Sequence, residues 1–511
     1  MSVAAIMPEV VRNARIQLRP KRMLATALIC AAVSFTAYIY HTHPRSQGFA
    51  SEMFAFLLSL EITVLVIGGG IYCLQSIHRE KELNTFDYQR ITRLSPLELM
   101  LGKLFGAPIL TYFILLCLAP ITLIAAFLSQ VTVVKILWIY AILLLGAITW
   151  HTFALVVSLL TGRGTSAGAI IFFLLLVFLT TSFEGNRTRM LGLRGIGPFA
   201  LIELAGAAQS QTPYGHATEL PAGQDLLFGT PVSHILVLVI LYVSLTGWLM
   251  LALVRNMKRD PSMYEIFSPV EAFGFVIYLH LIVLAFFQWS RLYPLADRTI
   301  GVRFAGRDVA PMQAEHEILS VSLWLFAILG LTLLRNRERV RHRILELGKS
   351  ATNWWAALWP GPYLLGGVLT VGLVLIAMIR YKLHPVSQWS VGMAFFEVCF
   401  VAVWMLRDAL YLQWMNLRRG RRALVAALIY LIVFYICSSA LFTGLGFYRT
   451  GDFANGTYVE PWEIFDMNFG SWTGAKVVWI GALVCLLLEA FVFASLQRRQ
   501  LTKLRESTRL S

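Results

Sequence analysis

The segment His78–Lys103, HREKELNTFDYQRITRLSPLELMLGK, is a charged stretch between two long apolar runs. Because charged side chains are costly in hydrocarbon, the segment must leave the bilayer, and its mixed charge is typical of a cytoplasmic connection. Its second half contains a helix-start signal: Ser95 can cap, Pro96 suits the first helical position, and Glu98 falls where a capping-box acid reaches back. We therefore expect a short amphipathic helix at the membrane surface.

The order of residues in this segment resembles that in the membrane subunit of type-2 (ABC-2) ATP-binding cassette exporters. The shared features are an acid-basic-acid cluster, a Thr, a later Pro, and a Gly-Lys pair that opens the next span. The matching residues are Glu80, Lys81, Glu82, Thr85, Pro96, Gly102 and Lys103. That family usually has Gly before the Thr, where this chain has Asn84, and Asn best replaces Gly in a left-handed conformation. The resemblance covers about the first 255 residues.

The resemblance implies that residues 78–103, including Glu98, form a gating and coupling segment. It also implies a separate cytoplasmic ATPase partner, expected in two copies, which binds ATP and Mg²⁺. The sequence has no G-x-x-x-x-G-K-[ST] phosphate loop, since Gly162-Arg163-Gly164-Thr165 lacks the lysine and the spacing. We therefore expect neither a catalytic residue nor a bound cofactor on this chain.

Composition places the chain in a membrane. Of its 511 residues 58% are hydrophobic and 14% are charged, whereas soluble domains carry about 25% charged residues. The net charge of +15 includes no basic arm or aromatic-basic groove, so we expect no nucleic-acid partner. The six cysteines all fall inside apolar runs without C-x-x-C spacing, and His41-Thr42-His43 lacks a third ligand, so no metal site is predicted.

The apolar runs predict an all-α, polytopic integral membrane protein with about twelve transmembrane helices. The six runs of the first half are Met23–Tyr40, Met53–Ile77, Leu104–Leu128, Val133–Leu160, Thr165–Phe183 and Ile235–Val254. The six of the second half are Ala272–Trp289, Leu319–Leu334, Tyr363–Ile379, Trp389–Leu406, Ala423–Leu445 and Val477–Leu496.

These runs define the expected domains. Residues 1–22 form a cytoplasmic interfacial helix on membrane lipid, with Arg12, Arg15, Arg19 and Arg22 at helical spacing. Residues 23–254 form an ABC-2-like six-span permease unit, with an outer loop at 184–233. Residues 255–496 form a second six-span unit, and residues 497–511 a cytoplasmic basic tail.

Charge distribution gives the orientation. With the N-terminus inside, more than two thirds of the 43 Lys and Arg residues fall in inner segments, as the positive-inside rule requires. We therefore expect a multi-pass protein with both termini cytoplasmic, in the cytoplasmic (inner) membrane of a bacterium.

The two halves resemble each other weakly. Leu345–Lys349 contains a Gly-Lys placed as in Leu97–Lys103, and each half ends with a sizeable outer loop before its last span. Two fused six-span units would supply the whole path in one chain. If the second half is merely appended, a homodimer is needed instead, and the sequence leaves both readings open.

Ionisable residues inside the apolar runs are candidates for function, because a charge at the bilayer centre costs about 2.5 to 3.5 kcal/mol on the insertion scale. Glu61 and Glu397, with His151 as a partner, are candidates for the translocation path. The alternative is that each acid pairs with a neighbouring helix or lies near an interface. We favour this alternative for Glu489, which is close to the inner end of its run.

The leading functional hypothesis is the membrane-spanning permease subunit of an ATP-driven exporter, which is not itself an enzyme. A membrane-embedded glycosyl or acyl transferase with a lipid-linked donor is the alternative. Such an enzyme needs a carboxylate pair in an early outer loop, and His41–Ser51 contains none. An ion-coupled secondary transporter is the third hypothesis, which titration of Glu61 or Glu397 would support.

Overall fold

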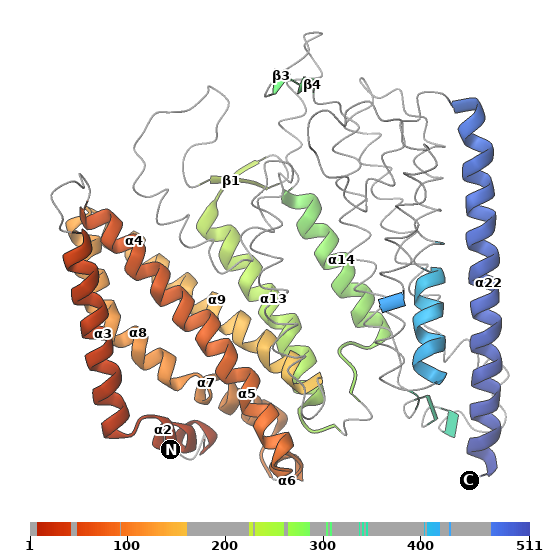
Figure 1. The fold of residues 1–511 in the computed structure, drawn as a ribbon, viewed down its shortest axis with the longest axis horizontal. Coiled ribbons are helices and arrows are strands. Elements are labelled where there is room, and N and C mark those ends of the chain that lie inside the picture. Colours follow the sequence, from red (N-terminus) through yellow and green to blue (C-terminus); the bar gives the residue numbers. More distant parts are fainter. Residues whose placement is uncertain are drawn as a thin grey trace. The chain divides into compact units, whose positions relative to one another are not determined.

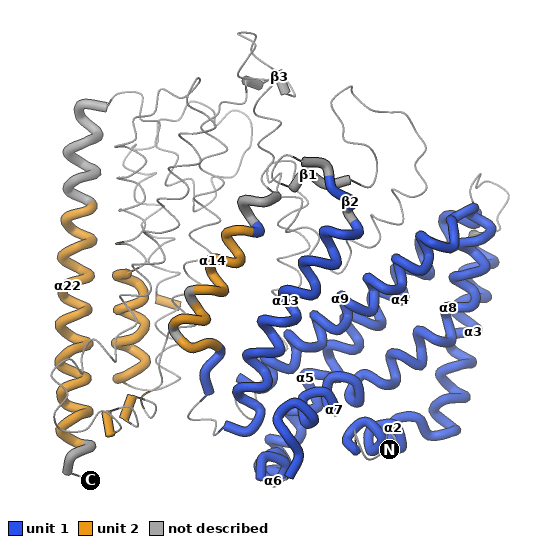
Figure 2. The backbone as a smooth tube through the Cα atoms, turned by 180° about the vertical axis from the view of Figure 1, so that it is seen from behind, with its two compact units in different colours: residues 1–266, 282–288 blue, residues 267–281, 289–511 orange. Residues whose placement is uncertain are grey.

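The computed structural model describes residues 8–41, 49–91, 93–160, 224–227, 230–259, 264–286, 303–304, 307–308, 337, 340–341, 344–345, 403, 406–418, 429–430 and 472–510. The predicted fifth span, most of the outer loop at 184–233, Glu397 and most of the spans predicted for the second half lie outside the described residues. The chain divides into two compact units, residues 1–266 with 282–288 and residues 267–281 with 289–511 (Figure 2).

The first unit is largely helical (Figure 1). Five described helical segments are long and apolar enough to cross a membrane, which agrees with an integral membrane protein. The helices up to and including the acid-basic-acid cluster are α2 (Pro8–Gln17), α3 (Pro20–His41), α4 (Phe49–Ile62), the π-helix η1 (Thr63–Gly68) and α5 (Gly69–Glu82). Those after it are α6 (Thr85–Ile91), α7 (Pro96–Gly106), α8 (Ile109–Leu128), α9 (Val133–Leu160) and α13 (His234–Met257).

Several of these bounds agree with the apolar runs, and two differ. Helix α9 has the predicted bounds, and α4, η1 and α5 form one unbroken span around the predicted second run. The predicted third span from Leu104 begins instead at Ile109, because Pro108 has no N–H to donate and its ring disrupts a continuing helix. The N-terminal helix is shorter than residues 1–22, since it ends at Gln17 and Pro20 begins α3.

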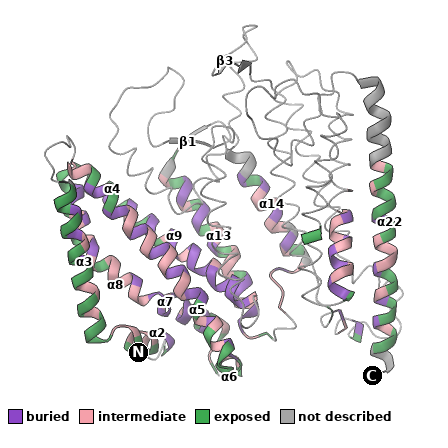
Figure 3. Cartoon of the chain, in the orientation of Figure 1, coloured by how far each residue is buried: buried purple, intermediate pink, exposed green. Residues whose placement is uncertain are grey.

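The core of the first unit lies around α9, which packs against α5 and α13, while α4 packs against α8. Buried residues line α9, and α3 is largely exposed (Figure 3). Gly146 lets α9 approach α13 closely, because a Cβ there would lie 3.3 Å from the ring of Tyr242. The hydroxyls of Thr149 and Thr246 lie 2.6 Å apart across the same contact, which is typical of packed membrane helices.

Short strands are the exception to the expected all-α class. β1 (Gln224–Leu227) pairs antiparallel with β2 (Thr230–Ser233), directly before α13. β3 (Arg303–Phe304) and β4 (Arg307–Asp308) form a second, minimal hairpin.

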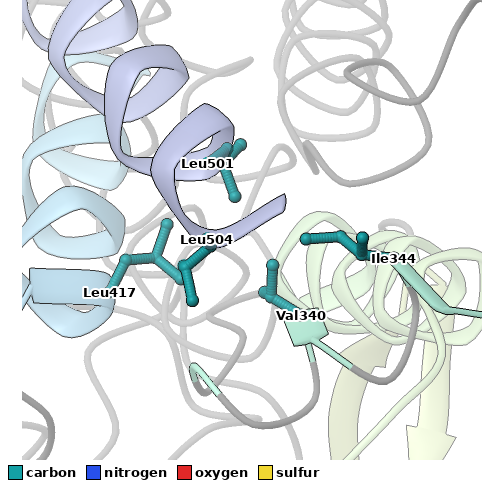
Figure 4. Packing of buried hydrophobic residues seen from close by; sticks show 5 residues of the cluster. All are labelled: Val340, Ile344, Leu417, Leu501 and Leu504. Atoms are coloured by element: carbon teal, nitrogen blue, oxygen red, sulfur yellow. The ribbon is translucent and has the colours of Figure 1, made fainter. Parts of the chain in front are cut away.

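Besides β3 and β4, the second unit contains three main described helical segments. These are α14 (Pro269–Phe286), whose last residues belong to the first unit, α22 (Trp472–Leu510) and the helical residues 406–418. The predicted basic tail at 497–511 continues α22 as a helix to Leu510. Its apolar side packs in a small cluster (Figure 4) made of Val340, Ile344, Leu417, Leu501 and Leu504. Glu489 lies 3.2 Å from the guanidinium of Arg407, so this acid pairs with a neighbouring segment, the reading that the sequence favoured.

Candidate coupling site

A tight turn separates α5 from α6 within the segment His78–Lys103. Asn84 has φ of 56°, so its predicted left-handed conformation is confirmed. The hydroxyl of Thr85 donates to the carbonyl oxygen of Glu80 at 3.3 Å. The turn therefore bends the chain back so that α6 lies close to the end of α5.

The predicted capping box at the start of α7 is present. The backbone N–H of Glu98 donates to Ser95 Oγ at 3.2 Å, and the backbone N–H of Ser95 donates to Glu98 Oε2 at 2.6 Å. Pro96 occupies the first helical turn. The hydrogen bond from the Ser95 backbone, with that from its side chain, lowers the pKa of the Glu98 carboxyl.

An ion-pair network joins α2, α5, α6 and α7, and we call it the Glu80 cluster. Its members are Glu9, Arg12, Glu80, Gln89 and Lys103. Lys103 donates to Glu80 and lies 3.9 Å from Glu9, while only 1% of its surface is exposed. Arg12 donates to Glu80 at 3.1 Å and to Glu9 at 2.6 Å. Glu80 Oε1 also accepts from Gln89 Nε2 at 2.8 Å, so three helices besides α5 hold one carboxylate.

Gly102 and Gly106 explain how α2 comes so close to α7. A Cβ on Gly102 would lie 2.6 Å from Glu9 Cβ, and one on Gly106 would lie 3.1 Å from Val10 Cα. The Gly-Lys pair therefore lies inside α7, where the glycine admits α2 and the lysine binds Glu80, and it does not open α8. Gln17 Nε2 donates to the carbonyl oxygen of Ala107 at 3.0 Å and holds the other end of α2.

Lys81 takes part in a different contact from its neighbour Glu80. Its Nζ donates to the carbonyl oxygens of Ser158 at 2.8 Å and Leu159 at 2.6 Å, in the last turn of α9. A buried cation there satisfies carbonyl groups that a helix end leaves unpaired and complements the helix dipole. Lys81 therefore fastens the end of α5 to the end of α9.

The predicted site residues thus make different contacts in the structure. It brings Glu80 together with Lys103, whereas Glu82 is half exposed and pairs with His78 at 3.2 Å. The sequence did not identify Glu9, Arg12 or Gln89 as part of the site. The one available signal was the spacing of Glu9 and Arg12, which lie one helical turn apart. Nothing indicated that Arg12 meets Glu80, 68 positions later.

The candidate path residues lie in two separate polar contacts inside the candidate spans. Glu61 accepts hydrogen bonds from Thr122 Oγ1 at 2.6 Å and from the Tyr140 hydroxyl at 3.0 Å. His151 Nε2 lies 2.8 Å from the carbonyl oxygen of Leu65, so its contacts are with η1 rather than with Glu61.

The π-helix and Gly69 make room for this histidine. A Cβ on Gly69 would lie 2.1 Å from His151 Nε2, a distance that no side chain tolerates. The other ring nitrogen, Nδ1, lies 3.4 Å from the Tyr112 hydroxyl. The imidazole therefore fills the space that a residue with a side chain would occupy. π-Helical turns of this kind are frequent at functional sites.

Among the described residues, no group of three or more His, Cys, Asp or Glu side chains could hold a metal ion. Comparison with protein-family models, with curated proteins and with solved structures finds no match to this chain. Any functional assignment therefore rests on the residues and geometry described above.

Proposed function

We propose that this chain is the membrane-spanning permease subunit of an ATP-driven exporter of the ABC-2 type. A separate ATPase subunit would bind and hydrolyse ATP, and the segment from Glu80 to Lys103 would pass its movement to the membrane helices. The chain would then be a transport subunit with no catalytic residue of its own.

The observation that carries this proposal is a set of large apolar side chains exposed outside the candidate spans. Tyr88 is 70% exposed and Ile91 is 82% exposed on α6, and Leu83 and Leu97 on either side of that helix are also exposed. Exposed apolar side chains that form a patch mark a surface that binds a protein or a membrane. A cytoplasmic ATPase is the partner that the ABC-2 resemblance implies for this segment.

The Glu80 cluster supports a mechanical role for this surface. Through it, α6 and α7 are joined to the end of α5, which is continuous with a candidate span, and to α2, which precedes another. Lys81 adds the end of α9. A displacement of α6 and α7 would therefore be passed to several membrane helices through these polar contacts, a short chain of the kind that coupling between sites uses.

The contact between α2 and α7 also supports placing them on one side of the membrane. Between them the chain passes through two candidate spans, α3 and the continuous α4–η1–α5 helix. Two crossings return the chain to the side from which it started, so the contact and the predicted inner location of both segments agree.

Purification from the native membrane tests the proposal. The full chain should copurify with an ATPase, and Tyr88→Ser with Ile91→Ser should reduce that association strongly while the chain stays inserted and folded. Leu128→Ser is the control, because Leu128 is similarly exposed but lies at the C-terminal end of α8, far along the chain from α6. An ATPase yield equal in the α6 double variant and the wild type, at equal expression, would remove the docking role.

Coupling is tested separately from docking. Two variants change only exposed groups: Glu82→Ala, and Ser95→Ala with Glu98→Ala. Both should fold and bind the ATPase nearly as the wild type does. They should nevertheless uncouple ATP hydrolysis from transport. Wild-type transport and ATPase stimulation in both would mean that this is only a solvated charged segment.

The mass of the purified complex decides between one chain and two. One chain with two ATPase copies supports two fused six-span units, whereas two chains support a homodimer.

A further inference from the structure

The Glu61 carboxylate is built into a buried contact between three helices of the first unit. It is 1% exposed on α4, Thr122 of α8 donates to its Oε1 at 2.6 Å, and Tyr140 of α9 donates to its Oε2 at 3.0 Å. Both recorded contacts of the carboxylate are with neutral hydroxyls. Among the described residues, no Lys, Arg or His forms an ion pair with it.

Three other ionisable groups on the helices around α4 have partners other than Glu61. Cys30 of α3 and Cys117 of α8 interact with each other, and His151 of α9 is bound to the Leu65 carbonyl. The remaining ones on these helices are Lys21, Arg22, Tyr38, Tyr40 and His41 on α3, Glu52 on α4 itself, Tyr112 on α8 and Lys135 on α9. Tyr140 is therefore the ionisable side chain in contact with Glu61, and it is neutral at ordinary pH.

Thr122 gives the contact two satisfied hydrogen-bond arrangements. Its hydroxyl lies 2.6 Å from Glu61 Oε1 and also 3.2 Å from the carbonyl oxygen of Leu118, one turn earlier in α8. With Glu61 ionised, Thr122 and Tyr140 each donate to one carboxylate oxygen. With a proton on Oε1, Glu61 donates to Thr122 Oγ1, Thr122 turns its own hydrogen to the Leu118 carbonyl, and Tyr140 still donates to Oε2.

We propose that Glu61 is a proton-binding site inside the membrane, with Thr122 as the hydroxyl that reverses its hydrogen bond when the proton binds. Uptake adds one proton from water to Oε1 and rotates one hydroxyl hydrogen, and no other bond changes. An apolar membrane interior disfavours the ionised form, whereas two converging hydroxyls favour it, so neither form is locked in. Release of the proton strengthens the bonds to α8 and α9 and thereby tightens these helices on α4.

Infrared difference spectroscopy of the full chain in lipid nanodiscs tests the proposal. As pH is raised over the range in which the protein stays folded, the carbonyl band of a buried protonated carboxylic acid should disappear and a carboxylate band should replace it. The pair of bands should be absent in Glu61→Gln and unchanged in Glu52→Gln, the control on the same helix. Bands that persist in Glu61→Gln, or a Glu61 carboxyl that never changes state, overturn the proposal.

Thr122 provides the second test. Thr122→Val removes a donor to the ionised form and should move the midpoint of the titration up by about one pH unit. Thr122→Ser keeps the hydroxyl and should leave the midpoint near that of the wild type. Equal midpoints in the Val and Ser variants would overturn the role of Thr122. The measurement needs no ATPase, so its failure leaves the proposed transport function untouched.

Discussion

The first unit has two polar regions, the Glu80 cluster and the contacts of Glu61 and His151, and they stabilise buried polar side chains in different ways. In the Glu80 cluster, at the helix ends, carboxylates are held by Lys103 and Arg12. Deeper in the candidate spans, Glu61 is held by hydroxyls and His151 by a backbone carbonyl. Ion pairs cost much desolvation in hydrocarbon, whereas neutral donors cost little. The comparison predicts that the stability contributed by the Glu80 cluster depends on charge. The stability contributed by the polar contacts inside the spans should depend on shape and hydrogen bonding.

The largest effect is expected from Lys103→Met, which removes the buried cation of the Glu80 cluster. It leaves Glu80 and Glu9 short of a partner, and breaking a buried ion pair in this way costs about 3 to 5 kcal/mol. The melting temperature in detergent should fall sharply. Arg93→Met, which changes a basic residue on an exposed turn, is the control and should melt as the wild type does.

A double variant sharpens that prediction. Glu80→Gln combined with Lys103→Met removes both charges and should recover part of the lost stability. A double variant less stable than Lys103→Met alone would show that charge pairing is not what the cluster contributes.

Gly69→Ala should have the next largest effect, through shape. The new methyl group would overlap the His151 ring, and overpacking a filled core costs about 1 to 3 kcal/mol. Gly68→Ala is the matched control in the preceding position, because its Cβ would make only ordinary contact at 3.6 Å with Thr111. Equal melting of the two variants would mean that the histidine moves aside at no cost.

The capping box of α7 should contribute less, and its contribution should depend on pH. Ser95→Ala should cost about 1 kcal/mol, as loss of an N-cap does. Because the pKa of Glu98 is lowered in the folded protein, its contribution is complete at neutral pH and is lost as pH falls through the folded pKa. Melting curves at decreasing pH should therefore converge for wild type and Glu98→Ala. Curves that stay parallel would exclude this role for Glu98.

The smallest effect on stability is expected from Glu82→Ala. Glu82 is half exposed and its partner is His78, which is charged only when protonated. Exposed pairs of this kind contribute about 0 to 1 kcal/mol. Glu80→Ala, two residues earlier, should cost clearly more in the same melting assay. Equal losses of stability at the two positions would contradict this distinction between a largely buried and an exposed acid.

What the sequence could predict was local. The capping box at Ser95 and the left-handed Asn84 follow from residues within one turn of each other, and both are confirmed. The bounds of α9 follow from an apolar run ended by polar residues. The Glu80 cluster needed a contact between distant segments, for which a single sequence contains no signal. For the same reason, the sequence could not predict that Gly102 makes room for Glu9 or that Gly69 makes room for His151.

The close approach of α2 to α7 also orders events during synthesis. Gln17 meets Ala107, a residue made 90 positions later. At about 5 to 20 residues per second, α2 waits roughly 5 to 20 seconds for its partner to emerge. Arg12 has Glu9 as a neighbour one turn away throughout that interval, and the two side chains lie 2.6 Å apart in the finished molecule. The N-terminal helix therefore meets its binding surface on α7 only after the two candidate spans between them have been made.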